Sequence, residues 1–196
     1  MCVPHVRGSQ SAAGVGVQFS GLAAGARKAT ALSDTMTEEL PVAAPQTTFA
    51  DLGVIPETVE ALDSVGIHHP FPIQSLAIPI AINGPDMIGQ ARTGTGKTLA
   101  FGVSLLQRIV AKTDAGYADH HPKGKPQALV MCPTRELALQ VADDLQVAST
   151  VRRVRVLTVY GGVGYDTQMN TLTTGVDVVV GTPGRLLDLA TRRALD

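Results

Sequence analysis

The sequence has few cysteines and no long apolar run, and each absence excludes a class of protein. Cys2 and Cys132 are its only cysteines, and no CxxC pattern occurs. A disulfide framework and a cysteine-based zinc site are therefore excluded, and a reducing, cytoplasmic setting is predicted. No run reaches the roughly 18 consecutive apolar residues of a membrane-spanning helix, so none of this sequence has the composition of a membrane anchor.

The sequence also lacks an excess of charge of either sign. Lysine and arginine number 16 and aspartate and glutamate 17, giving a formal net charge of −1 at pH 7. No overall basic field therefore attracts nucleic acid, and any bound polyanion must be held by local geometry. The 20 glycines and 12 prolines among 196 residues stay below the fraction typical of chains that are disordered throughout.

The first 45 residues differ in composition from the rest of the chain. They are rich in Ala, Gly, Ser and Thr without helical or strand periodicity, which predicts a disordered tail. Three positive charges before Asp34 leave a transit peptide open, and residues 12–26 leave a signal-peptide segment open. The favoured alternative is a start of translation at Met36, directly ahead of the domain expected over residues 46–196.

From residue 46 onward, helical and strand-like segments alternate. Expected helices cover residues 56–65, 74–82 and 97–111, with two more after Cys132 and from Arg185. Expected strands cover residues 86–90, 128–132, 154–160 and 176–180, and a surface loop is expected over 113–126. This alternation predicts an α/β fold in which helices cover both faces of a parallel sheet.

One segment between an expected strand and an expected helix is highly specific. It reads Ala91-Arg92-Thr93-Gly94-Thr95-Gly96-Lys97-Thr98. This matches the phosphate-loop pattern except that Ala91 replaces the first glycine. Gly94 and Gly96 allow a tight turn that aims N–H groups at an anion, Lys97 would reach the β- and γ-phosphates, and Thr98 would be a Mg²⁺ ligand. The segment predicts nucleoside triphosphate binding, the alternative being a glycine-rich turn with a solvated lysine.

Further segments, in the same order, resemble motifs of the DEAD-box RNA helicase family. They are Phe49 with Gly66–Gln74 (Q motif), Pro133-Thr134-Arg135-Glu136-Leu137-Ala138 (motif Ia), Gly161-Gly162 (GG element) and Thr182-Pro183-Gly184-Arg185 (motif Ib). Residues 91–98 resemble motif I, and Phe71 departs from the threonine common in the family. The resemblance covers residues 46–196 and implies an incomplete N-terminal RecA-like lobe, a P-loop NTPase fold.

The resemblance implies that these residues bind ATP, Mg²⁺ and RNA. Gln74 would read the adenine edge and Phe49 would stack on the base. The expected phosphate and metal contacts are Thr93, Gly94, Thr95, Gly96, Lys97 and Thr98, with Lys97 and Thr98 also catalytic. The expected contacts to the RNA sugar-phosphate backbone, independent of base sequence, are Thr134, Arg135, Gly161, Gly162, Thr182, Gly184 and Arg185. The structural alternative is that the threonines cap helices and the glycines form a turn.

The 196 residues contain neither an Asp-Glu-Ala-Asp nor a Ser-Ala-Thr sequence, and no second lobe. The family uses all three for hydrolysis, and phosphoryl transfer depends on such placed charges. We therefore expect this chain alone neither to hydrolyse ATP nor to unwind RNA, and to expose apolar sheet surface. A non-catalytic nucleotide- or RNA-binding module is the alternative, and a small P-loop kinase is disfavoured.

Two clusters outside these motifs favour surface roles. The histidine pairs at 68–69 and 120–121 are adjacent rather than one helical turn apart, and no cysteine or acid completes a metal site. Arg152, Arg153 and Arg155 alternate around Val154, and we expect them to solvate one face of a strand, the alternative being a contribution to a basic rim.

Overall fold

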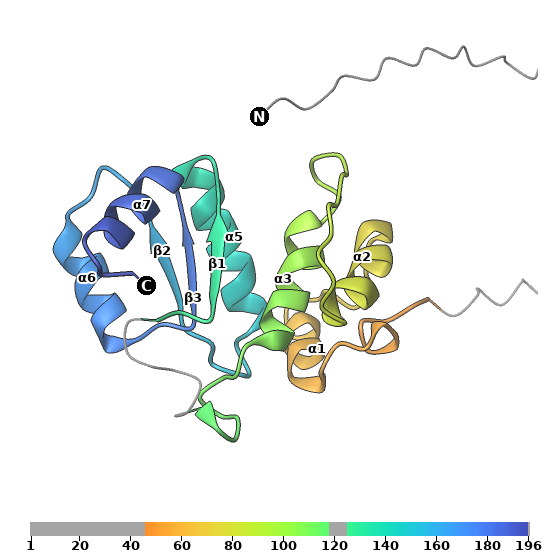
Figure 1. Cartoon of the computed structure of the whole chain (residues 1–196). Coiled ribbons are helices and arrows are strands. Elements are labelled where there is room, and N and C mark those ends of the chain that lie inside the picture. Colours follow the sequence, from red (N-terminus) through yellow and green to blue (C-terminus); the bar gives the residue numbers. More distant parts are fainter. Residues whose placement is uncertain (1–45, 118–124, 196) are drawn as a thin grey trace, which may run out of the picture. The chain divides into compact units, whose positions relative to one another are not determined.

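The computed structural model describes residues 46–117 and 125–195 (Figure 1). These residues belong to Ala43–Asp196, one of the two units into which the chain divides. The predicted tail over residues 1–45, and residues 118–124 of the predicted loop, lie outside the described residues. The elements are η1, a 3-10 helix (Ala50–Leu52), α1 (Pro56–Asp63), α2 (Pro72–Ile82), α3 (Lys97–Arg108), β1 (Ala128–Met131), α5 (Arg135–Ala148), β2 (Val156–Val159), α6 (Tyr165–Thr174), β3 (Val178–Gly181) and α7 (Pro183–Thr191). None of these helices is long and apolar enough to cross a membrane.

Three parallel strands form the sheet in the order β1-β3-β2. Successive side chains of the central strand point to opposite faces. Val178 and Val180 pack with α3 and α5, whereas Val179 packs with α6 and α7. Figure 1 shows α5 on one face of the sheet and α6 with α7 on the other. The predicted α/β fold, a parallel sheet flanked by helices, is confirmed.

Two segments differ from the sequence-based prediction. The strand expected at residues 86–90 is wrong, because this segment pairs with no strand in the described part of the chain, and Ile88 is fully exposed at 101%. A single extended segment has no neighbour to satisfy its backbone N–H and C=O groups. Helix α6 was missed, because only Gln168 and Leu172 of its ten residues are buried and its apolar periodicity is weak.

Arg152 is buried, which corrects the prediction that it solvates a strand. The residue is 6% exposed, and its guanidinium donates to the carbonyl oxygens of Leu106 and Ile109 and to the carboxylate of Asp114. It thereby gives a donor to the Ile109 carbonyl at the C-terminal end of α3, and a second donor to the Leu106 carbonyl, which already accepts the Ile109 N–H. Burial opposes ionisation of Asp114, but the Ala111 N–H and Arg152 outweigh it and lower the pKa of this carboxyl.

We expect Arg152→Met to lower the free energy of unfolding by about 2–4 kcal/mol, because it removes the buried donor that two carbonyl groups and the Asp114 carboxylate share. Urea unfolding at pH 7 measures this effect. Because the pKa of Asp114 is lowered in the folded state, its contribution to stability is present above its unfolded pKa and is lost as the pH falls. The difference between wild type and variant is therefore expected to shrink below about pH 4.

The neighbouring Arg153 provides the control for this prediction. Arg153 is exposed, and we expect Arg153→Met to change the free energy of unfolding by less than about 0.5 kcal/mol. Equal stability of the two variants would contradict the role assigned to Arg152.

The free edge of β1 exposes apolar side chains. Leu129 is 48% exposed and Met131 67%. With Phe101 they line an apolar groove of about 430 Å³ beside α3 and α5. Within the described residues β1 pairs with β3 alone, so this edge has no second neighbour. The expected exposure of apolar sheet surface is confirmed.

We expect Met131→Lys to raise severalfold the concentration at which the 196-residue chain self-associates, because a charge on an open strand edge opposes edge-to-edge pairing. Sedimentation velocity over a concentration series measures this. Leu187→Lys is the matched control, since Leu187 is similarly exposed, at 70%, but belongs to helix α7 rather than to strand β1. An equal effect of both substitutions would show that general surface polarity, rather than the β1 edge, governs association.

Candidate functional site

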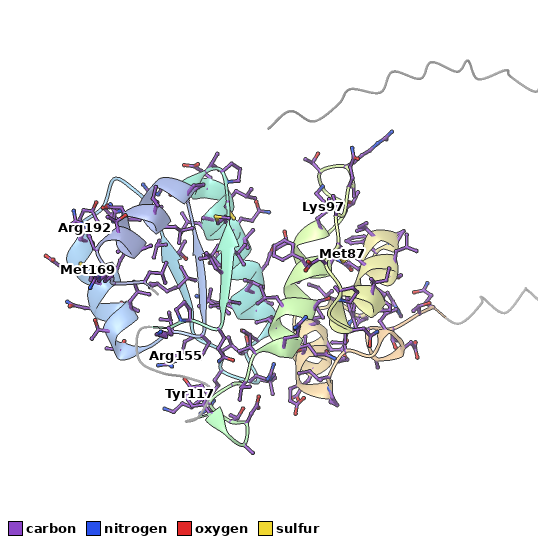
Figure 2. All side chains as sticks on the ribbon, in the orientation of Figure 1. Met87, Lys97, Tyr117, Arg155, Met169 and Arg192 are labelled. Atoms are coloured by element: carbon purple, nitrogen blue, oxygen red, sulfur yellow. The ribbon has the colours of Figure 1, made fainter. Side chains whose placement is uncertain are left out.

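A pocket of about 750 Å³ lies where α2, the loop before α3 and the first turn of α3 meet α5. Its volume is within the range of small-molecule sites. The predicted nucleotide-binding residues on its wall are Gln74, Thr93, Gly94, Gly96, Lys97 and Thr98. Figure 2 shows Lys97 at the start of α3, next to this loop. The structure therefore brings together all of the predicted nucleotide-binding residues except Phe49 and Thr95.

The loop before α3 has the backbone that its glycines allow. Gly94 has φ 78° and Gly96 has φ 80°, in the left-handed region that L-residues rarely adopt. Gly96 is also the N-cap of α3, so the positive end of the helix dipole lies at the pocket. A Cβ at Gly96 would collide with the Gln74 amide and lie 2.7 Å from the Phe71 ring. Only glycine fits this close approach.

The Lys97 ammonium lies against its own loop. Its Nζ donates to the carbonyl oxygens of Ala91 at 2.6 Å and Arg92 at 2.5 Å. The Thr95 hydroxyl donates to the same Arg92 oxygen at 2.7 Å. The positive charge is therefore held beside the N-terminus of α3, and a bound phosphate would replace carbonyl oxygens as its partner.

Gln74 joins α2 to the loop. The residue is 1% exposed. Its Oε1 accepts the Phe71 N–H at 2.8 Å, and its Nε2 donates to the Gly96 carbonyl at 2.9 Å. A carboxamide has two donor hydrogens and two acceptor lone pairs, so these two bonds use half of its hydrogen-bonding capacity. That Gln74 reads a base was predicted from the sequence, whereas its hydrogen bond to the loop was not.

Phe49 is not available to stack on a base. It is 1% exposed and packs in the core with Leu62 and Ile78. Stacking requires an open ring face, so this prediction is wrong. Phe71 is instead 56% exposed and, with Ile67, lines the pocket. The Phe71 ring was not predicted to line the pocket, because in the sequence this residue stands out only as a departure from the family's threonine.

The Thr98 hydroxyl lies beside a carboxylate from α5. Burial raises the pKa of Asp144, a hydrogen bond from Thr98 counteracts this, and Asp143 adds to the increase, leaving the pKa above its usual value. Among the described residues, no group of three or more His, Cys, Asp or Glu side chains is placed to hold a metal. Mg²⁺ commonly takes one or two protein oxygens and completes its shell with water and phosphate. The Thr98 hydroxyl fits this donor set.

The predicted RNA-binding segments follow the three strands at one edge of the sheet. The last residues of the strands, Met131, Gly181 and Val159, lie opposite one another in register. The segments after them therefore meet at the carboxyl edge, where open α/β sheets bind ligands. The exposed members are Thr134, Arg135, Gly161, Gly162 and Gly184, and Thr182 is half-buried.

Two of these residues have partners within the protein: a helix cap was the stated alternative for Thr134, and the ring contact of Arg135 was not predicted. Thr134 caps α5, where its hydroxyl accepts the Leu137 N–H at 3.3 Å. The Arg135 guanidinium lies over the Tyr160 ring, 4.6 Å from its centroid. Both side chains are nevertheless exposed at the carboxyl edge.

The prediction that Arg185 contacts RNA directly is wrong. Arg185 is 8% exposed. Its guanidinium donates to Gln168 Oε1 at 3.0 Å and to the Val163 carbonyl at 2.9 Å, and it stacks on Tyr165 with its carbon 4.1 Å from the ring centroid. These internal contacts occupy the group that would bind a phosphate.

Comparisons with known proteins agree with the predicted family. The family model described as DEAD/DEAH box helicase matches residues 71–196. The ATP-dependent RNA helicase RhlB of Pectobacterium carotovorum is 44% identical over 142 residues, covering 72% of this chain and 32% of RhlB.

Two solved structures share the fold. Dbp5 of S. cerevisiae, bound to RNA and ADP BeF3, is 30% identical with a TM-score of 0.63, over 76% of this chain and 35% of Dbp5. A DEAD box protein of the hyperthermophile Methanococcus jannaschii is 31% identical with a TM-score of 0.67, over 76% of this chain and 38% of that protein.

The chain spans about a third of the length of these relatives. The matched residues include the phosphate loop and the three segments at the carboxyl edge of the sheet. The predicted family is therefore confirmed: the chain belongs to the DEAD/DEAH box helicases.

Proposed function

We propose that this chain is the ATP-binding and RNA-contacting N-terminal lobe of an ATP-dependent RNA helicase, which in full length couples ATP hydrolysis to duplex unwinding. The observation that carries the proposal is the pocket in which Gln74 is bonded to Gly96 while Lys97 lies within the loop. A base-reading amide, a phosphate-binding cation and a helix N-terminus line this one site. Their combination suits an adenine nucleotide.

In this proposal each part of the nucleotide meets a different element. The phosphates lie at the N-terminus of α3, where Lys97 exchanges carbonyl for phosphate oxygens. The free donor and acceptor of Gln74 face the adenine edge, and Ile67 and Phe71 contact the base. Thr98 would hold Mg²⁺, which when bound neutralises charge on the β- and γ-phosphates.

The proposed RNA contacts lie at the carboxyl edge of the sheet. Helices α5, α6 and α7 begin there, each directly after a strand-end segment. Their N-terminal N–H groups suit phosphate oxygens without reading base sequence. Support also comes from Dbp5, which is similar to this chain and whose structure holds RNA and ADP BeF3. A cytoplasmic location belongs to the same proposal, supported by the free thiol of Cys132.

We expect the 196-residue chain to bind ATP without hydrolysing it, because its sequence lacks the Asp-Glu-Ala-Asp carboxylates and phosphoryl transfer requires them to place metal and water. Phosphate release in the presence of Mg²⁺ and single-stranded RNA measures this. The Lys97→Ala chain, purified in the same way, gives the background rate. RNA-stimulated release above that background would contradict the prediction.

Calorimetric titration of the chain with MgATP, MgADP, MgGTP and MgGDP tests the proposed function. The proposal predicts one site per chain that prefers adenine to guanine nucleotides. A folded chain that binds neither nucleotide, or binds both equally, would refute adenine-specific binding. Equal binding would instead favour another class of P-loop protein.

A further inference from the structure

A chain of side-chain contacts connects the three segments at the carboxyl edge of the sheet. Arg135, after β1, lies over the ring of Tyr160, after β2. The Tyr160 carbonyl accepts the Gln168 Nε2 at 3.3 Å. Gln168 Oε1 in turn accepts a hydrogen bond from Nη1 of Arg185, which lies at the start of α7. The Nη2 of Arg185 donates to the Val163 carbonyl. The contacts thus run from one strand end to the next.

The central pair of this chain lies beneath the surface. Gln168 is 6% exposed and Arg185 8%. Tyr165 covers the Arg185 guanidinium, and Arg192 lies over the same ring, 4.4 Å from its centroid. Figure 2 places Arg192 at the side of the molecule formed by α6 and α7. A buried polar network whose members are all paired specifies one local arrangement, because each unpaired alternative is costly.

The pair anchors a loop that has few constraints of its own. A Cβ added at Gly161 or Gly162 would meet no other atom within 4 Å, and Gly162 has φ 84°. Such a backbone has many accessible conformations. The two anchors fall on either side of these glycines, at the carbonyls of Tyr160 and Val163. Ordering the loop before a ligand arrives lowers the entropic cost of binding.

We propose that Gln168 is a positioning residue for RNA: through Arg185 it holds the Gly161–Gly162 loop in the arrangement that meets the RNA backbone. This inference rests on the proposed function. Gln168 is too buried to touch RNA, so its effect passes through the loop backbone. Arg185 acts in the same way, which gives this arginine a role other than direct contact.

Gln168→Met tests the inference, because it preserves length and apolar packing while removing both hydrogen bonds. The dissociation constant of the 196-residue chain for a fluorescein-labelled ten-nucleotide oligouridine, measured by anisotropy, is expected to rise about tenfold. The affinity for MgADP is expected to stay the same. Gln168→Glu keeps an acceptor for Arg185 but loses the donor to Tyr160, and an intermediate affinity is expected.

Gln107→Met is the matched control. Gln107 also bonds two backbone groups of a loop, the Gly53 carbonyl and the Ile55 N–H, and lies outside both proposed binding sites. Its RNA affinity is expected to equal that of wild type. Hydrogen exchange gives a second readout: faster exchange over residues 160–164 is expected in Gln168→Met and not in Gln107→Met.

These measurements test separately whether the chain binds RNA and whether Gln168 positions the loop that contacts it. Absence of RNA binding by the wild-type chain would refute the proposed RNA contact itself. RNA binding that is equal in wild type and Gln168→Met would overturn the positioning role alone. An equal loss in Gln107→Met would likewise overturn it, because the effect would then reflect general stability.

Discussion

Lys97→Ala is expected to raise the dissociation constant for MgATP by about 10- to 100-fold, the usual effect of losing a hydrogen-bonded charge partner of an anion. The reason is geometric as well as electrostatic. The ammonium is held beside the N-terminus of α3 by the carbonyls of Ala91 and Arg92, so little reorganisation is needed when phosphate enters. Calorimetry with wild type and variant measures the change.

Lys112→Ala is the control for this substitution. Lys112 is exposed and does not line the pocket, so the variant has the same net charge as Lys97→Ala but an intact site. Its nucleotide affinity is expected to match wild type. If both variants weakened binding equally, general electrostatic attraction rather than the phosphate loop would explain the affinity.

Gly96→Ala is expected to abolish measurable nucleotide binding and to lower the free energy of unfolding by about 2–4 kcal/mol. Two effects add at this position. An L-residue at φ 80° is strained, and its Cβ would also displace the Gln74 amide and the Phe71 ring. The substitution therefore breaks the bond that joins α2 to the loop. Urea unfolding and calorimetry on the same sample measure both losses.

Gly53→Ala separates strain from collision. Gly53 has φ 83° but nothing within 4 Å of a Cβ, and it lies outside the pocket. We expect a loss of about 1–2 kcal/mol from strain alone, with unchanged nucleotide affinity. A Gly96→Ala chain that binds nucleotide like wild type would contradict the role given to the Gln74–Gly96 contact.

Local sequence patterns were sufficient to predict the phosphate loop and most of the sheet. The spacing of Gly94, Gly96 and Lys97 specifies a strained turn followed by a helix, and each of these properties is local. The valine-rich segment at 178–180 predicts a strand buried on both faces for the same reason. The topology of the sheet then determines which side chains lie at the carboxyl ends of the parallel strands.

The side-chain environments depended on contacts distant in sequence. Arg152 is buried because the end of α3, more than 40 residues away, presents carbonyl groups to it. Arg185 is turned inward by Gln168, on a helix that the sequence pattern did not reveal. Phe49, expected to stack on a base, is buried in the core, whereas Phe71, for which no exposure was predicted, is 56% exposed. Residue type alone predicts none of these three outcomes.

If α2, the loop at residues 91–96 and the start of α3 form one adenine-nucleotide site, a bound nucleotide changes the environment of the amides in all three. The most direct test is a ¹H–¹⁵N amide spectrum of the 196-residue chain titrated with MgADP. We expect saturable shifts that concentrate in residues 66–74 and 93–99. Shifts confined to other residues, or none from a folded chain at millimolar nucleotide, would contradict it.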